Sequence, residues 1–140
     1  MFNELPIHAM FVHFPIALFI VAWGFEGLSL LVRRPQWHEM ARSIFMLAVL
    51  GSAITVTTGF WEQWRLHLSH SVLTRHRSFG LMTLALGVIT LFVAHKLEKT
   101  NSTQKQKIFF VLLSMIVFSV LTTSYFGGEM VYEYGVGVSQ

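Results

Sequence analysis

Histidine is the residue type with which this chain could do chemistry. The sequence has seven histidines, no cysteine and no aspartate, which excludes disulfides, thiolate metal sites and aspartate proton relays. Two of the histidines, His8 and His13, precede Pro15 at the start of a long apolar run. An ionisable side chain and a helix breaker are both costly in a membrane helix, so we expect His13 to belong to a site.

A second histidine, His76, completes the predicted site. Imidazole nitrogen is a common axial ligand of haem iron, and a chain without cysteine cannot attach haem by thioethers, so the predicted cofactor is haem b. We predict that His13 and His76 are its metal ligands. The arginines would pair with the propionates, and the glycines would leave room for the macrocycle. The further cofactor-binding candidates are Arg75, Arg77, His8, Gly80, Gly127, Gly128 and Tyr132.

Four apolar runs must position these residues, and each is close to the ~20 residues that cross a bilayer. The chain is 54% hydrophobic and 12% charged, a composition typical of membrane proteins. The runs predict an all-α fold, a transmembrane four-helix up-down bundle in a single domain, residues 1–140. The helices are expected at about 8–32, 38–63, 71–97 and 106–126.

The C-terminal segment 127–140, GGEMVYEYGVGVSQ, is rich in glycine. Glycine disfavours helix, so the segment is expected to form an extended Gly-rich flap over the outer end of the bundle.

Lysine and arginine are concentrated in the first and third loops, which predicts that these loops are cytoplasmic. The chain would then be a multi-pass protein of the bacterial inner membrane with both termini periplasmic. The positive charges of Arg65, Arg75 and Arg77 fall on the outer side, against this trend. A haem propionate near Arg75 and Arg77 would explain their position.

Small and polar residues recur at helical spacing in three runs, which predicts the faces that point inward. The residues are His13, Ala17, Ile20, Gly24, Gly27 and Leu31 in the first run; Ala48, Ser52, Thr55, Gly59 and Glu62 in the second; and His76, Gly80, Thr83, Gly87, Thr90 and Ala94 in the third. His13, Glu62, His76 and Gly127 each lie 20 residues from a basic residue at the cytoplasmic end, about 30 Å along a helix. They are therefore expected to share one layer.

The chain resembles the bacterial four-helix membrane family known as domain of unknown function 2231. The likeness rests on HAMFVHFPIAL at the N-terminus, TGFWEQW at the end of the second run, His76, and GGEMVYEYGVGV at the C-terminus. It implies a compact inner-membrane module whose signature residues gather on the outer side. The chain departs from the family pattern at Ala9, where proline is usual, and at Tyr134, where histidine is common.

The predicted site favours a cytochrome that exchanges electrons with quinol or an outer-face redox partner. Two other functions remain open. One is a module that binds or transports copper or zinc through His8, His13, Glu62, His67, His70 and Glu129. The other is a cofactor-free membrane assembly subunit. A homodimer is compatible with all three, the lipid bilayer is a partner in each, and no nucleic-acid partner is expected.

Two ionisable residues lie outside the predicted site. Glu26, well inside the first run, is expected to reach the interface or to pair with Arg33, Arg34 or Arg42. His38 is expected to anchor the chain at the membrane interface.

Overall fold

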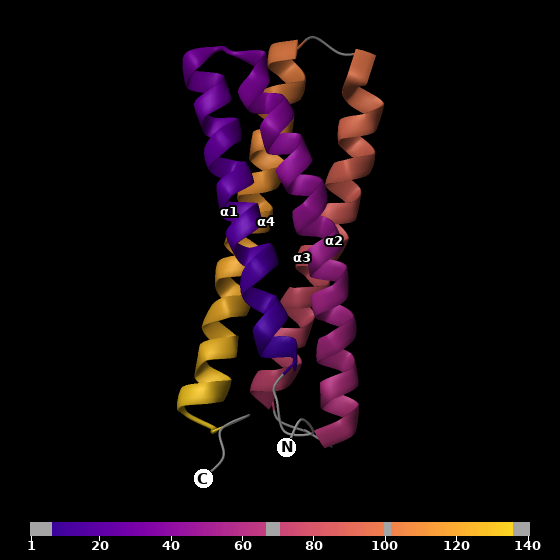
Figure 1. Ribbon diagram of the computed structural model, residues 1–140, viewed down its shortest axis with the longest axis vertical. Helices are drawn as coiled ribbons and strands as arrows, with labels where there is room; N and C mark the ends of the chain where they lie inside the picture. The colour runs from indigo at the N-terminus through magenta and orange to yellow at the C-terminus, as the bar shows by residue number, and fades with distance from the viewer. Residues whose placement is uncertain (1–6, 67–70, 100–101, 136–140) are drawn as a thin grey trace.

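Four long helices form an antiparallel bundle (Figure 1). The computed structural model describes residues 7–66, 71–99 and 102–135. All four helices are long and apolar enough to cross a membrane, which confirms the predicted all-α bundle and makes the chain a multi-pass integral membrane protein. The elements are α1 (Ile7–Val32), α2 (Pro35–Leu66), α3 (Ser71–Lys96), the short 3-10 helix η2 (Leu97–Lys99) and α4 (Ser102–Tyr132).

The bundle is built from two helical hairpins. α1 packs mainly against α2 and α3 mainly against α4, while the seams between the hairpins, α1 with α4 and α2 with α3, contain fewer contacts. The start of α1 and the end of α4 lie at the same end of the bundle, which we call the terminal end (Figure 1). The opposite end, where α1 meets α2 and α3 leads into η2, carries Arg33, Arg34 and Lys96, and we call it the basic end.

The connection between α1 and α2 is a tight turn made by Arg33 and Arg34. Arg33 has a φ of 53°, in the left-handed region that L-residues seldom adopt. Pro35 then starts α2, where its missing N–H costs no helical hydrogen bond. Because the turn is so short, the last turns of α1 lie directly beside the first turns of α2.

The core is apolar and partly aromatic, and it fills the bundle between its two ends. The ring centroids of Phe19 and Phe45 are 5.8 Å apart, and those of Phe45 and Phe109 are 5.3 Å apart. Leu113 and Ile116 of α4 are fully buried beside them. The outward faces carry many large apolar side chains, such as Leu50 and Phe118, as expected of helices in contact with lipid.

The prediction of a C-terminal flap is wrong over the described part of that segment. α4 continues as a helix through Gly127 and Gly128 to Tyr132. Each glycine costs a helix about 1 kcal/mol relative to alanine, but a helix keeps backbone groups hydrogen-bonded within the chain, which a membrane environment requires. Residues 136–140 of the expected flap lie outside the described residues.

Candidate functional site

The two histidine rings that meet are His8 of α1 and His76 of α3. Their centroids are 5.8 Å apart and their planes are perpendicular. The pair lies at the terminal end, with one ring from each hairpin. His13 is exposed, so the prediction that it points inward beside His76 is wrong. His8 occupies the position predicted for His13.

The inward face of α1 differs from the predicted one. Its buried residues are Pro15, Phe19, Ala22, Glu26 and Ser29, and the same spacing leads back to His8. Of the predicted face, Ile20 and Leu31 are 41% and 82% exposed. Exposing Glu26 and Ser29 to lipid would cost more than the close packing of small residues gains, so the polar residues determine the face.

The predicted inward faces of α2 and α3 are confirmed at their central positions. Ala48, Ser52 and Thr55 are buried on α2, and Thr83 and Thr90 are buried on α3. On these two helices the small residues and the polar residues lie on the same face. The small residues and the polar residues therefore predicted the same inward face for each of these helices.

Each ring of the pair is held by a backbone carbonyl of its own hairpin. His8 Nδ1 lies 2.9 Å from the carbonyl oxygen of Thr55, and His76 Nδ1 lies 2.9 Å from that of Thr123. A carbonyl oxygen can only accept, so Nδ1 donates its proton in both rings. In the neutral tautomer Nε2 then carries a lone pair, which is the arrangement that prepares histidine to bind a metal.

Two glycines provide the space for the rings. A Cβ at position 59 would lie 3.0 Å from the His8 ring, and one at position 127 would lie 3.2 Å from the His76 ring. Each glycine follows the accepting threonine by one helical turn. The helix surface is therefore open where the ring must approach the carbonyl oxygen.

The two hairpins repeat the same arrangement. Histidine and accepting threonine are separated by 47 residues in both. The shift of 68 residues that carries His8 onto His76 and Thr55 onto Thr123 also carries Gly59 onto Gly127. The threonine hydroxyls also match, since each donates to the carbonyl oxygen one turn earlier, at 2.9 Å and 2.8 Å. This repeated spacing of His, Thr and Gly was the sequence signal that could have identified His8.

A cavity of about 70 Å³ lies beside the histidine pair and is lined by residues of all four helices. Thr55 and Thr83 contribute polar groups, while Val12 and Phe19 contribute apolar ones. The volume accommodates a few water molecules or a metal ion. It is smaller than the ~300 Å³ or more typical of sites for organic ligands.

The two predicted propionate partners lie on aromatic rings at the terminal end. The Arg75 guanidinium is 5.9 Å from the centroid of Phe126, and that of Arg77 is 5.6 Å from the centroid of Phe60. Phe126 and Phe60 are the sequence neighbours of the two glycines that seat the histidine rings. Both arginines are exposed.

The remaining candidates are placed as follows. Gly80 lines the cavity, whereas Gly128 has no neighbouring side chain within reach and Tyr132 is 89% exposed. Glu62 forms a 3.6 Å ion pair with Arg65 of the same helix. Within residues 7–66, 71–99 and 102–135, no three His, Cys, Asp or Glu side chains gather into a metal-binding group. His67 and His70 lie outside the described residues.

A second polar site, not predicted from the sequence, lies near the basic end. The carboxylate of Glu26 is 2.9 Å and 2.8 Å, through its two oxygens, from Nδ1 of His38. Glu26 is fully buried and His38 is 4% exposed. The expectations that Glu26 pairs with an arginine and that His38 anchors the chain at the interface are therefore wrong, because the tight turn brings these two residues together.

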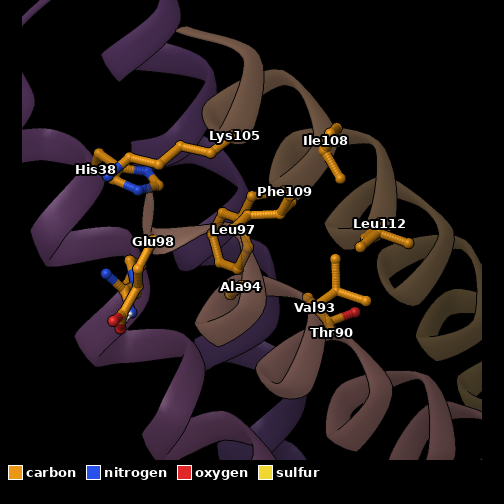
Figure 2. A pocket seen from close by; sticks show the side chains of 11 residues that line it. His38, Thr90, Val93, Ala94, Leu97, Glu98, Lys105, Ile108, Phe109 and Leu112 are labelled. Atoms are coloured by element: carbon orange, nitrogen blue, oxygen red, sulfur yellow. Dashed lines mark ion pairs between the residues drawn. The ribbon is translucent and has the colours of Figure 1, made fainter. Parts of the chain in front are cut away.

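His38 also lines a small cavity with charged residues (Figure 2). Arg42, Glu98 and Lys105 contribute to its wall, and Phe109 packs edge-on against the His38 ring at 5.7 Å. Thr90 lines the same cavity. Its buried hydroxyl has no hydrogen-bond partner within the part of the chain that the structure describes.

Comparison with known proteins agrees with this architecture. A search of curated proteins and a search of solved structures found no match. The family model described as "Predicted membrane protein (DUF2231)" matches residues 4–140, nearly the whole chain. Together with the four apolar helices, this match shows that the chain belongs to the DUF2231 family of predicted membrane proteins.

Proposed function

We propose that the protein binds a redox-active metal centre between His8 and His76, and that this centre is a b-type haem. The supporting observation is the pair of facing imidazoles, 5.8 Å apart, whose Nδ1 atoms are both engaged by carbonyl oxygens. His8 and His76 would hold the metal through their Nε2 atoms. Bound haem would supply one-electron redox chemistry, so the function would be electron transfer within the membrane.

The number of ligands favours haem over a bare metal ion. Protein zinc sites use three or four protein ligands, whereas no third metal-binding side chain joins the two histidines among the described residues. Haem needs only two axial ligands, because the porphyrin provides the other four. Arg75 and Arg77 would pair with its propionates.

The size of the cavity favours a bare copper or zinc ion, which is the second candidate. A cavity of about 70 Å³ is too small for a porphyrin, so haem binding requires the hairpins to separate at the terminal end. The seams between the hairpins are the less extensive contacts of the bundle. They are the place at which such a separation costs least.

The distribution of basic residues supports a position of this centre near the outer face of the membrane, with both termini periplasmic. The electron donor would be quinol or a redox partner on that side. A homodimer would place two such centres in one assembly.

A visible absorption spectrum of the purified protein, with metal analysis, tests this proposal. After expression with sufficient haem, we expect a Soret band and a reduced α-band characteristic of bis-histidine haem b. Stoichiometric copper or zinc without porphyrin would identify the second candidate instead. A preparation without colour or bound metal would contradict both.

The two ring-seating glycines provide a further prediction. Gly59→Ala should lower the affinity for the metal centre by about 10–100-fold, the usual effect of disturbing a group that orients a ligand, because the new Cβ would push against the His8 ring. Haem or metal titration by absorbance measures this change. Gly24→Ala is the control, since a Cβ there meets nothing within 4 Å, and equal affinities of the two variants would contradict the assigned role of Gly59.

A further inference from the structure

Glu26 and His38 form an ionisable pair inside two membrane helices. Ionisable side chains at such positions are costly and usually have a function. Both Glu26 oxygens lie within hydrogen-bond distance of a single nitrogen, Nδ1 of His38. This geometry fits one N–H group that donates to an ionised carboxylate.

We propose that this pair binds and releases a proton at the basic end of the bundle. Before uptake, the imidazole is neutral with its proton on Nδ1, and the pair has a charge of −1. The incoming proton adds to the lone pair of Nε2, because Nδ1 is already occupied. The product is an imidazolium beside a carboxylate, with no net charge, and the carboxylate compensates the buried positive charge.

The cavity beside His38 provides the access that proton exchange needs. Its charged lining comes from Arg42 of α2, and from Glu98 of η2 and Lys105 of α4, both labelled in Figure 2. Arg42 and Glu98 form a 3.6 Å ion pair whose side chains are 30% and 52% exposed, and His95 of α3 lies 3.6 Å from the same carboxylate. In this proposal, water would reach His38 through the cavity, from the rim where Arg42 and Glu98 lie. The buried Thr90 hydroxyl in the same cavity provides a polar partner for a water molecule.

The second hairpin shows that a helical hairpin of this kind does not require the pair. The shift that carries His8 onto His76 carries Glu26 onto Ala94 and His38 onto Gln106. The shared features of the two hairpins are the ring-holding groups at the terminal end. The ionisable pair is confined to one hairpin, so it is not part of the repeated arrangement. This inference does not depend on the proposed metal centre.

Nitrogen NMR of the histidine rings tests the proposal in the full-length, metal-free protein in lipid nanodiscs. On acidification, we expect the deprotonated Nε2 signal of His38 to be lost while Nδ1 stays protonated. In Glu26→Gln this change should be lost, because the imidazolium would be buried without a counter-charge. His95→Gln is the control and should leave the His38 signals as in the wild type.

Two results would overturn the proposal. The first is a His38 Nε2 signal that does not change with pH in the wild type, which identifies a structural pair. The second is the same titration in Glu26→Gln as in the wild type, which removes the carboxylate from the site. Circular dichroism tests whether the Glu26→Gln variant is folded. If the variant is unfolded, the wild-type titration alone decides whether the pair binds a proton.

Discussion

His76→Ala is expected to abolish the absorption spectrum of the proposed metal centre while the protein still inserts into the membrane. The ring of His76 supplies one of the two imidazoles that meet at this site among the described residues, and its Nδ1 is engaged by Thr123. Loss of one imidazole would leave the proposed centre without half of its protein ligands. His8→Ala should have the same effect, because the two rings occupy equivalent positions in the two hairpins. The measurement is the reduced-minus-oxidised spectrum, or metal content if the centre is an ion.

His13→Ala is the matched control for this pair of variants. It removes a histidine from the same helix, five residues from His8, but on the exposed side. The spectrum should be retained in full. Loss of the centre in His13→Ala, with retention in His8→Ala, would show that the ligand is His13 and would contradict the assigned pair.

His38→Leu should destabilise the protein by about 3–5 kcal/mol, the usual cost of leaving a buried charged group without its partner. Glu26 has no exposed surface, and His38 is its hydrogen-bond partner through both oxygens. The carboxylate would be left without compensation in an apolar surrounding. The free energy of unfolding in mixed micelles, followed by circular dichroism, measures the effect.

The double variant Glu26→Ala with His38→Gln should recover most of this loss. It places in the first hairpin the residues that the second hairpin carries at the equivalent positions, Ala94 and Gln106. No buried charge then remains at the site. A double variant as unstable as His38→Leu would show that the cost comes from lost packing rather than from the unpaired carboxylate.

Part of the site could be predicted from the sequence. His76 was correctly placed on an inward face, because Thr83 and Thr90 lie on the same stripe as the small residues of α3. On α1 the small residues and the polar residues lie on different faces. The small residues predicted the wrong inward face, because the polar residues are the buried ones. His8 and His13 differ by about 140° around the helix, so the choice of face decided which histidine reaches the site.

Other features depend on contacts that a single segment cannot show. Gly127 and Gly128 indicate a helix end locally, yet α4 continues through them, and Gly127 gives the His76 ring its space. Taken singly in the sequence, Glu26 and His38 each look like ordinary residues near the membrane interface. Their pairing follows from the turn at Arg33, whose left-handed conformation is not typical of arginine.

The sequence by itself determined the four membrane helices, because about 20 consecutive apolar residues can satisfy their backbone within a bilayer only as helix. It also made histidine the candidate side chain for metal binding, since there is no cysteine or aspartate. Only the tertiary structure decided that His8 meets His76 and that Glu26 meets His38. The physical reason is that the rotation of each helix about its axis depends on the groups of the neighbouring helices that it contacts. For α1 these groups are the carbonyl oxygen of Thr55, which lies beside Gly59 and binds His8, and the imidazole of His38, which lies across the tight turn from Glu26.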